Sequence, residues 1–135
     1  MNGLLNVSES AFLALHGMVI LAKISPERVR IKEMAKELKA SEAHLAKVFQ
    51  RLQKSGLVKS ARGPMGGYSL IPNPSKITFL DIYEATEGKV NMDICPFGKL
   101  ECMYDMCLFD QRIEALAQNI YNTFKEIKLS DYIKK

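Results

Sequence analysis

The sequence predicts a mainly α-helical fold with a small β-hairpin, organised as a winged helix-turn-helix domain followed by a long C-terminal helix. Three features predict this fold. Two short amphipathic helices occupy residues 30–38 and 41–55, a glycine-rich hairpin pattern follows at residues 57–70, and an apolar stripe of nearly heptad spacing runs through residues 109–127. A chain of 135 residues has room for one domain and one accessory helix.

The composition is that of a soluble globular protein, with 47% hydrophobic and 25% charged residues. The most apolar stretch, residues 11–22, contains His16 and has no basic flank or cleavage site before it, so we expect no membrane span or signal peptide and a cytoplasmic location. Residues 1–70 carry eleven Lys or Arg against five Asp or Glu, whereas residues 71–135 carry eight against ten. The basic half is expected to face a polyanion.

The first predicted helix begins at Ser8 or Ser10, either of which can serve as the N-cap, and runs to Ile24, before a Ser-Pro turn. We expect His16 to be a hydrogen-bonded core residue of this helix. The apolar residues that recur at helical spacing are Phe12, Leu15, Val19 and Ala22.

The next two helices form the predicted helix-turn-helix. The first, residues 30–38, has an apolar face made of Ile31, Met34, Ala35 and Leu38. The second begins at Ser41 and ends at Gly56, and its predicted buried residues are Leu45, Val48, Phe49 and Leu52. The second helix carries Lys, Gln and Arg on its outer face, as a recognition helix does.

Residues 57–70 read as two short strands around a turn, in which Gly66 and Gly67 allow positive φ angles. A hairpin directly after a recognition helix is a wing, and we expect Tyr68 to pack beneath it. A further helix is predicted from Thr78 to Glu87, closed by Gly88, with mostly inward-facing residues Phe79, Ile82, Tyr83 and Ala85.

The last predicted helix carries an apolar stripe broader than a small winged-helix domain needs. We therefore interpret it as the seam of a dimer. The stripe consists of Phe109, Ile113, Leu116, Ile120, Phe124 and Ile127.

Cys95, Cys102 and Cys107 are the only cysteines of the chain and lie within thirteen residues. In a reducing compartment, such cysteines are more often metal ligands or redox sensors than disulfides. Thiolates suit an iron-sulfur cluster, whereas structural zinc sites usually have Cys-x-x-Cys pairs and a clear fourth ligand, which this segment lacks. An iron-sulfur cluster is the preferred interpretation, with zinc, a thiol redox switch and inert thiols as alternatives.

Three groups of residues are candidates for DNA contact. Candidates for base edges lie on the outer face of the second helix, where glutamate can accept from cytosine and glutamine can pair with adenine. These are Ser41, Glu42, Ala43, Ala46, Lys47 and Gln50. Arg51, Lys54 and Lys59 are predicted phosphate contacts, and Arg62 at the wing tip is predicted to enter a minor groove.

The stretch from Ser41 through Leu70 resembles the Rrf family of bacterial winged-helix transcriptional regulators, the group of IscR-like and NsrR-like proteins. The resemblance spans nearly the whole chain, and its most specific parts are the wing motif Arg-Gly-Pro-Met-Gly-Gly-Tyr at 62–68 and the three cysteines. The resemblance implies a homodimer on a double-stranded, palindromic DNA operator and an iron-sulfur cluster, typically two-iron two-sulfur. It also implies a fourth ligand, either Glu9 from the first helix or Asp110, three residues after the last cysteine. The cysteine spacings of six and four residues differ from the family's five and five.

These predictions divide the chain into a DNA-binding domain (1–88), a cysteine-containing cluster loop (89–110), and a dimerisation helix with its tail (111–135). No nucleotide-binding loop or catalytic constellation is present in the sequence, so we do not expect an enzyme. Besides a thiol-redox or zinc-dependent repressor, a regulator that binds a protein partner through its wing face is the alternative.

Overall fold

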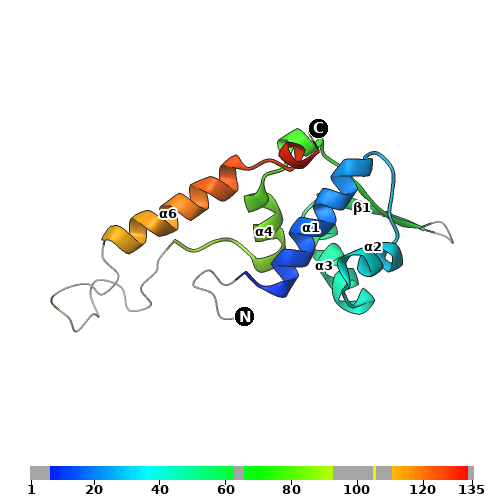
Figure 1. The fold of residues 1–135 in the computed structure, drawn as a ribbon, viewed down its shortest axis with the longest axis horizontal. Coiled ribbons are helices and arrows are strands. Elements are labelled where there is room, and N and C mark those ends of the chain that lie inside the picture. Colours follow the sequence, from blue (N-terminus) through cyan, green and yellow to red (C-terminus); the bar gives the residue numbers. More distant parts are fainter. Residues whose placement is uncertain (1–6, 63–65, 93–104, 106–110, 134–135) are drawn as a thin grey trace.

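The computed structural model describes residues 7–62, 66–92, 105 and 111–133, and its elements follow the predicted order (Figure 1). The helices are α1 (Glu9–Ile24), α2 (Ile31–Leu38), α3 (Glu42–Lys54), α4 (Phe79–Glu87) and α6 (Gln111–Glu126), the strands are β1 (Val58–Ala61) and β2 (Gly67–Leu70), and the 3-10 turns are η1 (Pro74–Lys76) and η2 (Leu129–Tyr132). In the described part of the chain, no helix has the length and apolarity needed to cross a membrane.

Side-chain caps explain where the helices begin. The Ser8 hydroxyl accepts a hydrogen bond from the Ala11 N–H at 3.0 Å, which confirms Ser8 as the cap of α1. Thr78 and Asp81 form a capping box at the start of α4, and Gly88 ends that helix with a φ of 89°.

The helix-turn-helix is confirmed. Its tight turn is closed by Lys39, which has a left-handed φ of 54°. Met34 and Ala35 of α2 are buried, as are the four predicted residues of α3, while Ile31 and Leu38 are partly buried against the same core. The alternation of apolar and charged residues in these short helices leaves one face that can be buried.

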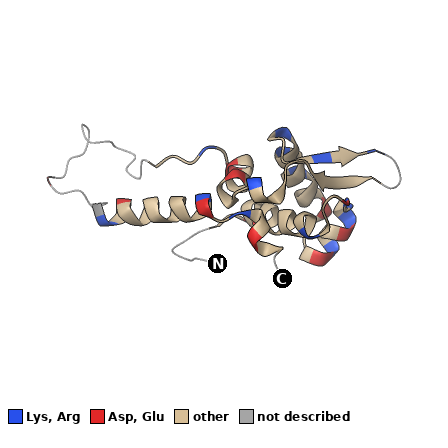
Figure 2. Cartoon of the chain, turned by 90° about the horizontal axis from the view of Figure 1, so that it is seen from above, with Lys and Arg blue, Asp and Glu red and all other residues tan. Residues whose placement is uncertain are grey.

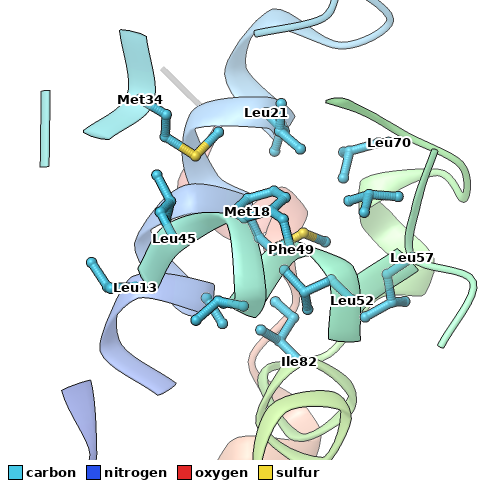
Figure 3. Packing of buried hydrophobic residues seen from close by; sticks show 14 of the residues in the cluster. Leu13, Met18, Leu21, Met34, Leu45, Phe49, Leu52, Leu57, Leu70 and Ile82 are labelled. Carbon is cyan, nitrogen blue, oxygen red and sulfur yellow. The ribbon is translucent and has the colours of Figure 1, made fainter. Parts of the chain in front are cut away.

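The core lies where α1, α2 and α3 meet beneath the wing, and Figure 3 shows Phe49 of α3 beside Met18 and Leu21 of α1. Phe49, Met18 and Leu21 have no exposed surface. This packing holds α3 against the body of the domain.

The predicted apolar stripe of α1 meets the core only in part. Ala22 is buried, Leu15 and Val19 are partly buried against the core, and Phe12 is 47% exposed. The buried residues of α1 are Ala11, Leu13, Ala14, Gly17, Met18, Leu21 and Ala22. Because α1 is apolar around most of its circumference, spacing alone does not indicate which side meets α3 and α4.

The prediction that His16 is a core residue is wrong. The His16 ring is exposed, lies 4.0 Å from the Phe12 ring between centroids, and its Nδ1 lies 2.8 Å from the Phe12 carbonyl oxygen. This bond to the preceding turn satisfies the imidazole at the surface.

The wing forms an antiparallel hairpin in which Val58 pairs with Leu70 and Ala61 with Gly67. Val29, in the connection between α1 and α2, adds an antiparallel bridge to Tyr68, with two backbone hydrogen bonds of 2.9 Å. The wing is therefore attached to the helix-turn-helix by a backbone ladder.

The helix α6 extends away from the rest of the domain and is attached at its C-terminal end (Figure 1). The Phe124 ring meets the rings of Phe79 and Tyr83 of α4 edge-on, with centroid distances of 6.3 Å and 5.8 Å. Beyond α6 the chain returns to the core, where Leu129 is fully buried and its N–H donates to the Ile77 carbonyl at 2.9 Å.

Candidate nucleic-acid interface

The exposed side of α3 is the centre of the candidate site. Its cap, Ser41, accepts a hydrogen bond from the His44 N–H at 3.3 Å, which fixes the first turn of the helix. Leu45, Phe49 and the other two apolar residues of α3 face the core, so the opposite side of the helix is left to solvent. We call this opposite side the outer face of α3; its members are Ala43, Lys47, Gln50 and Lys54.

Nine of the ten residues predicted to contact DNA are exposed. They are Ser41, Glu42, Ala43, Lys47, Gln50, Arg51, Lys54, Lys59 and Arg62. Lys59 lies on β1 and Arg62 follows that strand directly. The strand lies next to α3, since the side-chain amide of Gln53 in α3 donates to the Ser60 hydroxyl of β1 at 3.3 Å. Figure 2 shows basic positions on these elements, interspersed with acidic ones on the helices. Ala46, the remaining candidate for base edges, is partly buried.

Arg51 differs from the other candidates because it has a partner within the domain. Its Nη1 donates to the carbonyl oxygen of Thr86 at 3.1 Å, near the C-terminal end of α4. A cation at that end complements unpaired helix carbonyls and the helix dipole. Arg51 thus joins α3 to α4, a role that sequence reasoning missed because the two residues are 35 positions apart; its phosphate contact stays a prediction.

Close backbone contact fixes the wing relative to α3. A Cβ atom added at Gly67 would lie 2.6 Å from the Val29 carbonyl oxygen, and Gly67 has a φ of 149°. Only glycine fits that approach. The Tyr68 ring lies 5.2 Å from the Phe49 ring between centroids, in line with the predicted packing of Tyr68 beneath the wing.

Of the five predicted metal ligands, only Glu9 is among the described residues. Cys95, Cys102, Cys107 and Asp110 lie outside them. The Glu9 carboxylate is in the first turn of α1, 73% exposed, with Oε1 3.7 Å from Nδ1 of His44. Within the described residues no group of three or more His, Cys, Asp or Glu side chains is placed to hold a metal ion.

The apolar stripe of α6 divides into a covered end and an exposed end. Phe124 contacts α4 and Ile127 is partly buried, whereas Phe109 is outside the described residues. The exposed members are Ile113, Leu116 and Ile120, with exposed fractions of 39%, 60% and 40%. Large aliphatic side chains repeated on one side of a projecting helix are typical of an association surface.

Comparison with known proteins decides which class of helix-turn-helix protein this is. The family model that matches residues 7–135 is Rrf2, described as an iron-dependent transcriptional regulator. The chain belongs to the Rrf2 family. Its Rrf2 relatives include the HTH-type transcriptional regulator IscR of Cereibacter sphaeroides, 31% identical over 92% of this chain and 82% of the relative. An HTH-type transcriptional regulator of Aquifex aeolicus is 33% identical over 93% of this chain and 90% of the relative.

Solved structures agree with this assignment to the Rrf2 family. CymR, the global cysteine regulator of B. subtilis, superposes with a TM-score of 0.77 and 28% identity, over 96% of this chain and 97% of that one. The T. potens IscR structure gives a TM-score of 0.74 and 29% identity, over 94% and 85%. The predicted winged-helix fold is confirmed. Like its relatives, the chain is a DNA-binding transcriptional regulator and not an enzyme.

Proposed function

We propose that this Rrf2 regulator is a homodimer that reads a palindromic DNA operator with α3 and the wing, under the control of an iron-sulfur cluster. The observation that carries the DNA-reading part is the segregation of α3, whose large apolar side chains are buried while its basic ones lie on the exposed side, next to a wing strand. Helices of this kind enter the major groove with their N-terminal residues toward base edges.

Within this proposal each candidate residue has a role. Glu42 and Gln50 hydrogen bond to bases, and Ala43 contacts a thymine methyl group. Arg51, Lys54 and Lys59 position the protein on phosphates. Arg62 extends the contact into the minor groove.

The dimer forms through α6. Ile113, Leu116 and Ile120 lie within two turns of one helix, and pairing the same surface of two copies would remove them from water. Two-fold symmetry then sets two α3 helices about one turn of DNA apart, which is the geometry that a palindromic operator requires.

The cofactor part follows from the chemistry of the donor set. Three thiolates with one carboxylate, from Glu9 or from Asp110, fit a cluster of two irons and two sulfides. When bound, such a cluster supplies a centre that oxidants, nitric oxide or iron scarcity can alter. An oxygen ligand in place of a fourth thiolate weakens the site, which suits a sensor. The iron-dependent description of the family and the IscR relatives support this assignment.

Control of DNA binding is transmitted along the chain. Residues 89–110 connect α4 to α6, so a change of ligation at Cys95, Cys102 and Cys107 alters how α6 and its partner are held. The separation of the two α3 helices then changes, and only one separation matches the operator. The regulator acts in the cytoplasm.

A thiol-redox or zinc-dependent repressor without a cluster is the second candidate. The clustering of every cysteine of the chain in one segment is equally suited to it, and a relative in fold is named as a cysteine regulator. A regulator that binds a protein partner through the wing face, without salt-dependent DNA binding, is the third.

The test is the visible absorption spectrum and the iron and sulfide content of anaerobically purified protein, together with duplex binding before and after oxidation. The proposal predicts a coloured protein with about two irons and two sulfides per chain. The colour and the iron and sulfide should be lost in Cys102→Ala, and the affinity for the duplex should change when the cluster is lost. Colourless protein with one zinc, or with reversible thiol oxidation alone, would support the second candidate. Absence of salt-dependent duplex binding would support the third.

A further inference from the structure

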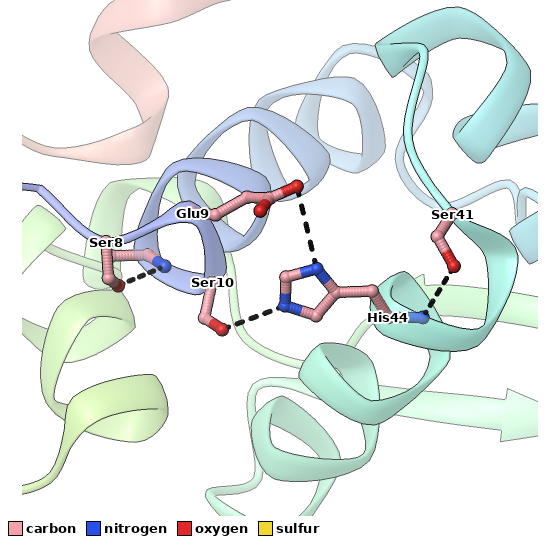
Figure 4. Close-up of polar contacts among 6 residues, drawn as sticks. Ser8, Glu9, Ser10, Ser41 and His44 are labelled. Atoms are coloured by element: carbon pink, nitrogen blue, oxygen red, sulfur yellow. Dashed lines mark hydrogen bonds and ion pairs between the residues drawn. The ribbon is translucent and has the colours of Figure 1, made fainter. Parts of the chain in front are cut away.

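The side chain of His44, in the first turn of α3, reaches across to α1 (Figure 4). Its Nε2 lies 3.0 Å from the Ser10 hydroxyl oxygen, at hydrogen-bond distance. Its Nδ1 faces the Glu9 carboxylate at 3.7 Å, and 32% of the His44 side chain is exposed. Ser10 and His44 are 34 positions apart, so this bond joins two elements rather than neighbours in one helix.

The surrounding groups favour one tautomer of the ring. A proton on Nδ1 faces the negative oxygen of Glu9, which leaves Nε2 as an acceptor for the Ser10 hydroxyl. At 3.7 Å and with 73% of its side chain exposed, Glu9 adds only a weak attraction. The Ser10 hydroxyl is therefore the main polar restraint on the ring.

The restraint acts on the first turn of α3, where Leu45 is fully buried. Apolar contacts such as those of Leu45 and Phe49 determine which side of the helix faces the core, but they are not directional. Hydrogen bonds are directional. His44 and Arg51 are seven residues, or about two turns, apart on α3; Arg51 is bonded to Thr86 of α4 as His44 is to Ser10 of α1. These two bonds fix α3 at two points along one side.

We infer that His44 is a positioning residue for DNA recognition, which acts through Ser10 to set the orientation of the first turn of α3. The inference rests on the proposed function, namely that the outer face of α3 reads bases. His44 lies beside Ala43, so a rotation of this turn moves that face relative to base edges. Phosphate contacts through flexible lysines tolerate such a rotation, whereas base contacts do not. Loss of the bond should reduce discrimination between sequences more than it reduces binding to DNA in general.

The experiment uses a duplex that the unaltered full-length protein selects from a random-sequence pool, and a scrambled duplex of equal length. Affinity for both is measured at several salt concentrations for Ser10→Ala, His44→Ala, the double variant and His44→Gln. The Gln amide can replace Nε2 and keep the bond to Ser10. Ser75→Ala is the matched control, because its hydroxyl donates to Asn73 at 2.9 Å in a turn remote from α3.

We expect Ser10→Ala and His44→Ala each to weaken binding of the selected duplex about threefold to tenfold, the effect of one hydrogen bond. Binding of the scrambled duplex and the salt slope should stay unchanged, the double variant should be no weaker than His44→Ala, and His44→Gln should recover most of the loss. Equal losses of affinity on both duplexes would overturn the inference, as would a double variant whose loss is the sum of the two single losses. It would also be overturned if Ser10→Ala bound normally while His44→Ala bound weakly, because His44 would then be a direct DNA contact. If the unaltered protein selects no duplex, the proposed function itself fails.

Discussion

Gly17 of α1 and Phe49 of α3 are packed so closely that a Cβ atom at position 17 would lie 2.8 Å from Cε2 and Cζ of the Phe49 ring. Met34 Sδ lies 3.0 Å from the same point, on the α2 side. The three helices therefore meet at a position where only a hydrogen atom fits. This contact sets how near α3 lies to the rest of the domain.

Gly17→Ala should lower the free energy of unfolding by about 1 kcal/mol, because overpacking costs about 1–3 kcal/mol and the better helix propensity of alanine offsets about 1 kcal/mol. The midpoint of thermal unfolding, followed by circular dichroism at one protein concentration, should fall by about 3–5 °C. Phe49→Leu removes the ring atoms in question, so Gly17→Ala should cost less in that background. An unchanged or raised midpoint for Gly17→Ala alone would contradict the close packing.

Gly67→Ala should detach the wing from the helix-turn-helix. The new Cβ would meet the Val29 carbonyl oxygen at 2.6 Å, in a strand position with positive φ, so both steric and conformational costs apply. We expect a loss of more than about 2 kcal/mol in the free energy of unfolding. Gly56→Ala is the matched control, because Gly56 has a φ of 79° but no atom lies within 4 Å of an added Cβ. Its loss in the free energy of unfolding should stay at about 1 kcal/mol. Chemical denaturation of both variants gives the comparison, and equal losses would argue against a specific wing attachment.

Lys47→Ala and Lys54→Ala separate base reading from phosphate contact along the outer face of α3. Lys47 is nearer the N-terminus of the helix, so Lys47→Ala should weaken the binding free energy for a selected duplex by about 1–3 kcal/mol and relax the preference for that sequence. Lys54 is in the last turn, so Lys54→Ala should weaken binding to all sequences alike and reduce the slope of log affinity against log salt concentration by about 1. Fluorescence anisotropy over a salt series measures both quantities. Lys125→Ala on α6 serves as the charge control and should leave both unchanged.

Leu116→Glu should convert the proposed dimer to a monomer. Leu116 is 60% exposed in the single chain, so the substitution has little to disturb within one copy. In a symmetric pair the substitution removes the burial of two leucines, one from each copy. This costs about 3–6 kcal/mol of association free energy and raises the dimer dissociation constant more than about a hundredfold. Light scattering coupled to size exclusion reports the mass, with Gln118→Glu as an equally charged control away from the stripe. A monomeric unaltered protein, or a dimeric Leu116→Glu, would contradict the proposed seam.

The sequence predicts the helix-turn-helix and the wing closely, because these elements alternate apolar and polar positions. Ser41 and the four buried residues of α3 are the clearest case. For α4 it predicts the bounds, but of the buried residues Leu80, Ile82 and Thr86 it predicts only Ile82. The prediction is less complete for α1, where apolar residues surround the helix and only its neighbours determine that Phe12 is exposed. It could not find the bonds from Ser10 to His44 or from Arg51 to Thr86, since no local pattern links residues more than thirty positions apart.

Because α6 is attached to the domain near its C-terminal end, a small rotation there moves its N-terminal end much further. A helix of 16 residues is about 24 Å long, and its contacts with Phe79 and Tyr83 lie at the Phe124 end. A tilt of about 5° at that aromatic pivot would displace the opposite tip by about 2 Å, by the same helical rise. Slight repacking around Phe124 is thus magnified at the far end of the helix, and in the proposed dimer it would change the angle between the two copies.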